Sequence, residues 1–419
     1  MRAFVVIFLI AVSGVAAAEP DVVIGEFELQ RVVDGDTVRV RGLDSSLRLL
    51  GIDTEETFKH DKERRAYAKG FAAYAKEVRG TSPRPAKFAT PLGDEAKKWA
   101  EAWFAGVTTV RLERDDPHEI KDRYRRYLAY VLAEKHGKWL NYNVEAVRAG
   151  MSPYFPKYGR SRRYDRDFIA AEAEAKAAKR GIWAPGAEAY PDYPEREAWW
   201  TARGDFVAKF HDEAARKPSK SRVAMIDLTH DDAVAQLEAN VGHDVVALGV
   251  VGEIERPGAT PHRKRGHHSS KSEAKAEGAR TIADRTANDV DDSNANTSTS
   301  TAYRDGWAGD PDAPNETDAD DAATAKSAAD EAGAESRASD GGHGKAPTRV
   351  ILDNHVQLVF FDPDVFAASG ISAWRGEWIR VSGKASLYHG KPEIVIDRAG
   401  QLELSPVPGL TRPRAAAAD

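Results

Sequence analysis

The 419-residue chain contains no cysteine and only three methionines. The absence of cysteine excludes disulfide bonds, thiol chemistry and cysteine-ligated zinc sites. After the N-terminal segment, no apolar stretch of the sequence is long enough to span a bilayer. A protein of this kind must therefore be held together by its apolar core or by a metal that is bound through other ligands.

The N-terminus is organised like a secretory signal peptide. Arg2 precedes an apolar run, Phe4 to Val12, and small residues end at Ala18. A membrane anchor is the alternative, but the run is short for a spanning helix and no positive flank follows it. We expect residues 1–18 to be removed on export, which predicts a secreted or periplasmic protein without a membrane attachment.

Charge is distributed unevenly behind a formal net charge of −6. Residues 21–185 contain 32 Lys and Arg against 26 Asp and Glu, whereas residues 281–345 contain 5 against 15. The basic front half is typical of a region that contacts polyanions, and the acidic stretch is typical of a solvated segment.

Alternating and helical periodicities divide the chain into an α+β domain, a helical linker and a second β-rich domain. Few large apolar side chains occur in the segment that interrupts the second domain, so we expect that segment to be disordered. The predicted boundaries are a signal peptide at 1–18, a first domain at 21–188, a helical linker at 189–221, a second domain at 222–257 and 346–408, and a disordered insertion at 258–345.

Three short motifs in the first domain contain residues suited to phosphate chemistry: VVDGDT at 32–37, RLLGIDTEE at 48–56 and DRYRRYLAY at 122–130. Asp34 and Asp36 are two residues apart in a predicted strand, so both carboxylates can point to one side, with a bulge at Gly35. Each motif alone has an ordinary explanation: a hairpin turn, surface ion pairs and the edge of a strand. Their combination in this order is more specific.

The three motifs, followed by a helix that ends in Gly-Ile-Trp, resemble the staphylococcal nuclease family over about residues 25–185. The resemblance implies an OB-type β-barrel with packed helices. It also implies a calcium-dependent endonuclease that hydrolyses DNA, RNA or both and leaves 3′-phosphate ends. The alternative is a catalytically inactive nucleic-acid-binding protein on the same fold. An extracellular adhesion protein is a third reading, which rests on the insertion alone.

The resemblance implies that residues at matching positions of this chain have the family's roles. Asp36, Asp53 and the backbone carbonyl of Thr54 correspond to calcium ligands. Asp34 corresponds to a nearby acidic residue that does not itself bind the ion. The other matches are Arg48 and Arg126 as phosphate-binding arginines, Glu56 as the carboxylate that activates water, and Tyr124 as a nucleotide contact. Hard oxygen ligands suit calcium, and paired guanidinium groups suit a developing phosphorane charge.

This chain departs from the family pattern at two places. Glu55 stands where the family has proline, which predicts an added charge beside the site and a looser turn. Residues 57–90 are longer than the corresponding loop, and we expect them to affect substrate access or metal affinity.

The second β-rich domain resembles small OB-fold modules that bind nucleic acid, although a purely structural barrel is equally compatible with the pattern. Strand alternation in EWIRVSG places Ile379 and Val381 in the core and Trp378 and Arg380 outside. Tyr388 is expected on the exposed side as well. An aromatic pair among cations would allow bases to stack, unless these rings pack against the first domain or the helix before it. The sequence gives no indication of oligomeric state.

Overall fold

The computed structural model describes residues 22–122, 124–216, 223–257 and 346–411. The expected signal peptide and the expected disordered insertion at 258–345 lie outside these residues. Within the described part of the chain, no helix is both long enough and apolar enough to cross a membrane.

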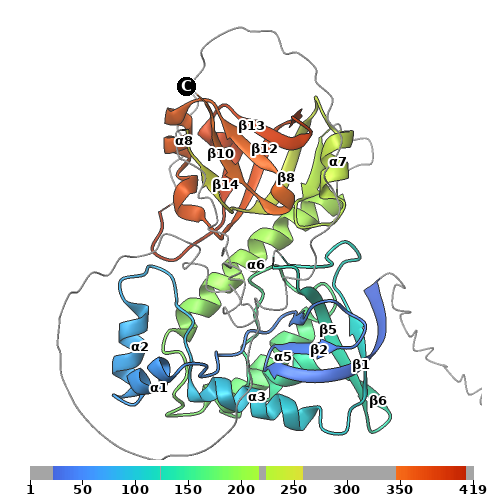
Figure 1. The fold of residues 1–419 in the computed structure, drawn as a ribbon, viewed down its shortest axis with the longest axis vertical. Helices are drawn as coiled ribbons and strands as arrows, with labels where there is room; N and C mark the ends of the chain where they lie inside the picture. Colours follow the sequence, from blue (N-terminus) through green and yellow to red (C-terminus); the bar gives the residue numbers. More distant parts are fainter. Residues whose placement is uncertain (1–21, 123, 217–222, 258–345, 412–419) are drawn as a thin grey trace, which may run out of the picture. The chain divides into compact units, whose positions relative to one another are not determined.

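The first domain is built on a six-stranded sheet of order β3-β2-β1-β4-β5-β6 (Figure 1). Strand β3 also pairs in parallel with β5, which closes five of these strands into a barrel. The expected OB-type barrel is thereby confirmed. Its strands are β1 (Val23–Asp34), β2 (Thr37–Val40), β3 (Leu47–Leu49), β4 (Thr109–Glu113), β5 (Tyr127–Lys135) and β6 (Lys138–Asn141).

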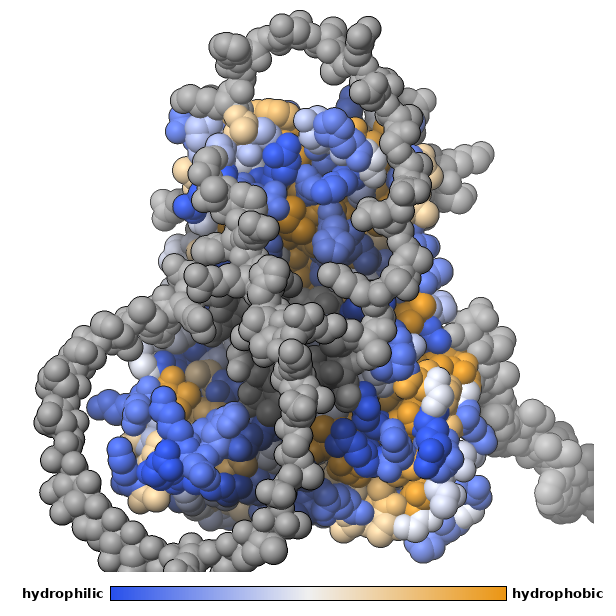
Figure 2. Space-filling view, in the orientation of Figure 1, coloured by the Kyte–Doolittle hydropathy of each residue, from blue (hydrophilic) through white to orange (hydrophobic). Residues whose placement is uncertain are grey.

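The sequence predicts one helix over residues 57–80, but the structure divides this region into two helices, with Gly70 as the N-cap of the second. Strand β6 is the one regular element of the barrel that the sequence patterns did not identify. The helices of this region are α1 (Asp61–Tyr67), α2 (Phe71–Arg79), α3 (Pro91–Trp103), α4 (Tyr142–Arg148), α5 (Asp165–Ala177) and the short 3-10 turn η2 (Gly181–Trp183). On the face that Figure 2 shows, the surface over α1 and α2 is largely hydrophilic, whereas apolar residues appear over the barrel.

The barrel core contains aliphatic side chains of β2, β3, β4 and β5, together with aromatic rings packed into the same cluster. Tyr142 at the start of α4 packs against Trp103 and Phe104, with ring centroids 5.1 and 4.6 Å apart. Leu47 and Leu49 of β3 are almost completely buried in the same cluster. Since β3 is only three residues long, this burial fixes where the intervening Arg48 can point.

The second domain is an eight-stranded sheet of order β7-β8-β12-β13-β11-β10-β9, with β14 paired to β12. Strand β9 precedes residues 258–345 and β10 follows them, and the two pair antiparallel. The segments on both sides of the expected insertion therefore form one sheet. Its elements are β7 (Ala224–Asp227), α7 (Ala233–Ala239), β8 (Asp244–Val250), β9 (Ile254–Glu255), β10 (Thr348–Ile351), η4 (Asp353–His355), β11 (Gln357–Phe360), α8 (Pro363–Ser369), η5 (Ile371–Trp374), β12 (Trp378–Tyr388), β13 (Lys391–Ile396), η6 (Ala399–Gln401) and β14 (Leu402–Leu404).

Helix α6 (Tyr193–Arg216) occupies most of the segment expected to be a helical linker, and apolar side chains bury it at both ends. Near its start, Trp200 packs edge-on against Phe155, with ring centroids 4.8 Å apart. Near its end, Phe210 lies in a buried cluster with Trp378 of β12. The helix thus contributes to two apolar clusters.

Candidate functional site

The first acidic motif forms the turn of the β1–β2 hairpin. Asp34 ends β1 and pairs with Thr37, so Gly35 and Asp36 are the two turn residues. The expectation that both aspartates lie within one strand is therefore wrong, because the hairpin interpretation of Asp-Gly-Asp applies. Both carboxyl groups are nevertheless buried, at 9% and 8% exposure.

Gly35 brings this hairpin against the second motif. A Cβ atom at this position would lie 2.7 Å from Cγ2 of Thr54, closer than real side chains approach. Tyr142 donates a hydrogen bond from its hydroxyl to the carbonyl of Gly35 at 2.6 Å, which holds the turn from the core side. The motifs VVDGDT and RLLGIDTEE are therefore in direct contact, as their joint role in one site requires.

Arg48 joins the carboxylates of these two motifs. It lies in β3 opposite Thr37 of β2, which directs its side chain toward the hairpin. Its Nη1 bonds to Oδ2 of Asp36, and its Nη2 lies 2.6 Å from Oδ1 of Asp53. The guanidinium is 9% exposed, so its direction is fixed by two charged bonds in a partly dehydrated site.

The charges in this cluster shift the acidity of its carboxyl groups. Burial would raise the pKa of Asp36, but Arg48 and Lys87 outweigh it and hold that pKa below its usual value. Burial, Asp36 and Glu56 together raise the pKa of Asp34 to about 7. Partial burial also raises the pKa of Glu56, an effect that Lys87 opposes. The site therefore contains more carboxylate than its cations neutralise.

Lys87 is a member of the site that sequence reasoning missed. Its Nζ lies 2.6 Å from Oδ1 of Asp53, the oxygen that also accepts a bond from Arg48. The residue comes from segment 57–90, which is longer than the corresponding family loop and folds as α1, α2 and a loop. No local pattern around position 87 signals this contact, because it spans 34 residues of sequence.

Glu55 does not loosen the turn, contrary to the expectation from its replacement of proline. Its side chain is 1% exposed, and Oε1 accepts bonds from the Tyr190 backbone N–H at 2.6 Å and the Tyr193 hydroxyl at 2.8 Å. Oε2 accepts a bond from Thr90, the N-cap of α3. Burial raises the pKa of Glu55 to about 6. The carboxyl group connects the segment 53–56 to α3 and α6 and holds it in place.

Arg126 is placed by a carboxylate of its own loop. Its Nε and Nη2 lie 2.8 and 2.7 Å from Oδ2 of Asp122, and the Tyr124 ring lies 5.5 Å from the guanidinium carbon. Arg126 directly precedes β5, whose Leu128 is the register partner of Arg48. Arg126 therefore lies in the loop before the strand that pairs with β3, and Asp122 rather than the Asp36–Asp53 pair holds its guanidinium group. Its predicted role at the phosphate stays a prediction.

The donor set of this site fits a hard divalent cation. All available ligands are carboxylate or carbonyl oxygens, which calcium prefers. One oxygen of Asp53 already bonds to Arg48 and Lys87, and Asp34, Asp36 and Glu56 are further carboxyl groups of the same cluster. Asp36, Asp53 and the carbonyl of Thr54 are the groups that would hold such an ion.

The aromatic surface expected in the second domain does not form. Ile379 and Val381 are in the core as expected, but Trp378 on the other side of β12 is only 2% exposed. Its Nε1 donates to the carbonyl of Lys157 at 3.1 Å. The expectation that Trp378 stacks bases is wrong, because α6 covers that face of the strand.

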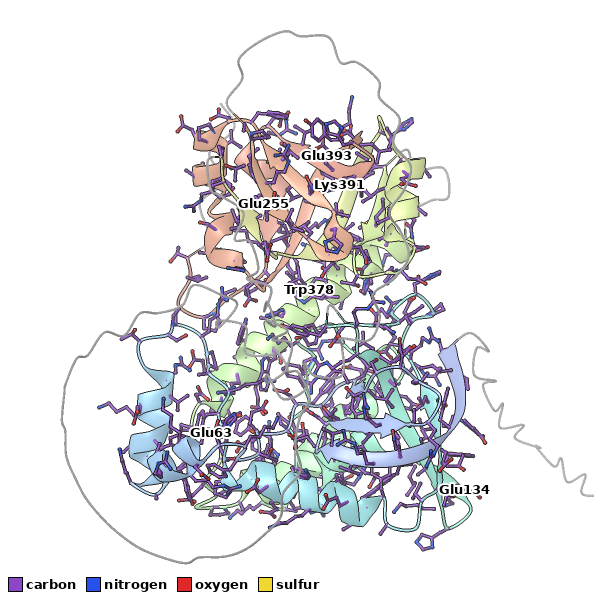
Figure 3. The ribbon with its side chains drawn as sticks, viewed as in Figure 1. Glu63, Glu134, Glu255, Trp378, Lys391 and Glu393 are labelled. Atoms are coloured by element: carbon purple, nitrogen blue, oxygen red, sulfur yellow. The ribbon has the colours of Figure 1, made fainter. Side chains whose placement is uncertain are left out.

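Arg380, the second residue expected on that surface, also contacts α6. Its Nη1 lies 2.7 Å from Oε2 of Glu213. Tyr388 is 51% exposed, as expected, and Arg349 lies over its ring at 5.6 Å. Figure 3 shows Lys391, the register partner of Tyr388, far along the sheet from Trp378. The three residues therefore cannot act as one nucleic-acid surface.

A barrel with an acidic, arginine-containing cluster is consistent with proteins that act on phosphate esters, and comparison with known proteins identifies the family of this region. Residues 46–185 match the family described as Staphylococcal nuclease homologue. An uncharacterized protein of Methanocaldococcus jannaschii is 32% identical over 155 residues, which cover 36% of this chain and 69% of that protein. The chain therefore belongs to the staphylococcal nuclease family.

Two thermonucleases are also similar to this chain. The thermonuclease of Staphylococcus hyicus is 29% identical over 165 residues, covering 38% of this chain and 75% of that enzyme. The thermonuclease of Staphylococcus intermedius is 29% identical over 162 residues, covering 37% and 74%. These relationships support a nuclease, a member of the hydrolases that acts on nucleic acid.

Proposed function

We propose that the first domain is a calcium-dependent endonuclease that hydrolyses phosphodiester bonds of DNA, RNA or both and leaves 3′-phosphate ends. The observation that carries this proposal is the Arg48 guanidinium, which bridges Asp36 and Asp53 within the cluster that also contains Glu56. The thermonuclease relatives support the same assignment.

Glu56 is the proposed general base. A carboxylate can accept a proton from a water molecule as the water oxygen bonds to phosphorus. The P–O5′ bond breaks, the phosphate stays on the 3′ oxygen, and the 5′ oxygen takes a proton from water and leaves as a hydroxyl. Burial raises the pKa of Glu56, which makes its carboxylate a stronger base than a fully solvated one.

The arginines are the proposed electrostatic stabilisers of the reaction. Arg48 is held by two carboxylates, so its charge is fixed before substrate binds and need not reorganise during the reaction. Asp122 orients Arg126 in the same way. When bound, calcium supplies charge neutralisation for the phosphodiester. Asp36, Asp53 and Thr54 contribute its ligands.

The test uses the purified full-length protein with plasmid DNA and with a structured RNA, in calcium and in a chelator. The proposal requires cleavage in calcium, none in chelator, and products that accept no ligation at the 3′ end until a phosphatase removes the phosphate. Binding of either nucleic acid without any cleavage would establish the catalytically inactive alternative. Cleavage that leaves 3′-hydroxyl ends would reject the proposed bond.

Export is part of the proposal and is supported by the N-terminal sequence alone. We propose that the mature protein begins after Ala18 and acts outside the cytoplasm, where nucleic acid would be free substrate. N-terminal sequencing of protein from the periplasm and from the medium tests this. A retained Met1 in cytoplasmic protein would contradict it.

A further inference from the structure

A second group of ligand-type side chains lies away from the carboxylate cluster. His211 of α6, Asp227 at the end of β7 and His230 three residues later each bring one ligand atom within 4.8 Å of the other two. Oδ2 of Asp227 lies 2.7 Å from Nε2 of His211 and 3.8 Å from Nε2 of His230. Separations of this size are close to those between neighbouring ligands of a single metal ion.

The carboxylate of this group is oriented by its own loop. Oδ1 of Asp227 accepts bonds from the Thr229 backbone N–H at 2.9 Å and the Thr229 hydroxyl at 2.7 Å. Oδ2 therefore faces the two histidines. The Asp227 side chain is 4% exposed, and its desolvated charge is partnered by Nε2 of His211 at 2.7 Å. Such support from a neighbouring hydroxyl is common behind metal-binding carboxylates.

His230 has a buried nitrogen that the protein leaves unsatisfied. Among the described residues, its Nε2 has no hydrogen-bond partner, and that atom is inaccessible to solvent. A buried ring nitrogen without a partner is costly, and native structures usually provide a reason for it. A metal bound between Nε2 of His230 and Oδ2 of Asp227 would provide one.

A second histidine–aspartate pair lies beside this group. His118 stacks on His230 at 5.8 Å, and its Nδ1 lies 3.0 Å from Oδ1 of Asp231.

We propose that His211, Asp227 and His230 bind one transition-metal dication of the zinc type through Nε2, Oδ2 and Nε2, with water as the fourth ligand. Two imidazole nitrogens with one carboxylate suit zinc and its neighbours and do not suit calcium, which prefers oxygen. The site joins α6 to the turn after β7, and its metal stabilises that junction. The proposal is independent of the nuclease assignment.

Arg162 limits the affinity of this site and gives a specific test of it. Its Nη2 lies 3.3 Å from Nδ1 of His211, and its Nη1 bonds to Asp116 at 2.5 Å. Coordination through Nε2 moves the imidazole proton to Nδ1, where it would face another donor. Arg162 is 39% exposed and has room to withdraw. Arg162→Gln supplies an acceptor instead, so this substitution tightens zinc binding.

The experiment is a zinc titration of the metal-stripped full-length protein against a chromophoric chelator, with the melting temperature as a second readout. Residues 262–268 contain three histidines that could bind zinc weakly. His262→Gln, His267→Gln and His268→Gln are therefore introduced into every sample. One equivalent of zinc should bind and raise the melting temperature, and an excess of calcium should not displace it.

The variants determine where the zinc binds. Asp227→Asn and His230→Gln should each weaken zinc binding by roughly 10–100-fold or more, as expected for loss of a ligand or its support. The exposed His243→Gln is the matched control and should bind as the parent does. Unchanged affinity in His230→Gln, or no binding by the parent protein at 100-fold excess zinc, would overturn the proposal and leave a hydrogen-bonded His–Asp group. Circular dichroism of each zinc-free variant verifies that it folds.

Discussion

The ammonium group of Lys87 lies 2.6 Å from Oδ1 of Asp53, an oxygen that also bonds to Arg48. Asp53 is one of the proposed calcium ligands. Lys87, from the longer segment 57–90, therefore places a positive charge beside the proposed metal position. We therefore expect calcium, if it binds at the proposed position, to compete with the lysine for this carboxylate. Through Lys87, the longer segment is expected to lower metal affinity.

Lys87→Met tests the competition. Removing a charge a few ångströms from the ion should lower the calcium concentration for half-maximal cleavage by about tenfold, which corresponds to about 1.4 kcal/mol. The measurement is a calcium titration of the cleavage rate, with the exposed Lys98→Met of α3 as control. A higher calcium requirement in Lys87→Met would show that the lysine supports metal binding instead.

Asp122→Ala tests whether Arg126 depends on its loop carboxylate. Without the contacts to Nε and Nη2, the Arg126 guanidinium loses its orientation, so kcat should fall by roughly 10-fold while KM changes little. Arg125→Gln removes an exposed charge from the adjacent position and should leave both constants near the parent values. If Asp122→Ala altered only KM, Arg126 would contribute to binding and not to the transition state.

Gly93→Ala tests the packing that positions Glu56. A Cβ atom at position 93 of α3 would lie 2.0 Å from the backbone oxygen of Glu56. Gly→Ala within a helix normally stabilises by about 1 kcal/mol, but here it should destabilise by about 1–3 kcal/mol and reduce cleavage. Gly400→Ala, where a Cβ atom meets nothing within 4 Å, is the control. Increased stability of Gly93→Ala would contradict the close contact.

The raised pKa of Asp34 predicts that the metal-free protein loses stability as the pH rises. Its folded-state pKa is raised from 3.8 to about 7, so the folded protein retains a proton that the unfolded chain releases. Stability should therefore decrease as pH rises from about 4 to 7, by up to about 4 kcal/mol, and the decrease should be complete above pH 7.

Asp34→Asn removes this titration. In chelator, the melting temperature of Asp34→Asn should exceed that of the parent at pH 8, and the difference should vanish near pH 4. A constant difference across this range would mean that Asp34 does not titrate in the folded protein.

The family resemblance of the motifs was sufficient to predict the Asp36–Arg48–Asp53 cluster, and pairing between β2 and β3 brings Arg48 next to the hairpin that contains Asp36. Lys87 and the role of Glu55 could not be predicted. Tyr190, which donates its backbone N–H to Glu55, is 135 residues away in sequence, and nothing local at either position indicates the contact.

In the second domain, period-two alternation predicted correctly which β12 residues face the core. It could not reveal what covers the opposite face. Trp378 is buried there by α6, a helix more than 160 residues earlier in the chain. Alternation distinguishes two faces of a strand, but only tertiary packing determines whether the second face meets solvent.

The most direct test of the nuclease assignment is the calcium-dependent cleavage rate of Glu56→Gln. The control is Glu134→Gln, an exposed glutamate of β5 that Figure 3 shows at the far edge of the barrel. Loss of the general base should reduce kcat by about 10²-fold or more in Glu56→Gln, with unchanged circular dichroism, while Glu134→Gln cleaves at the parent rate. A parent rate in Glu56→Gln, or equal cleavage with calcium and with chelator, would contradict the proposed mechanism.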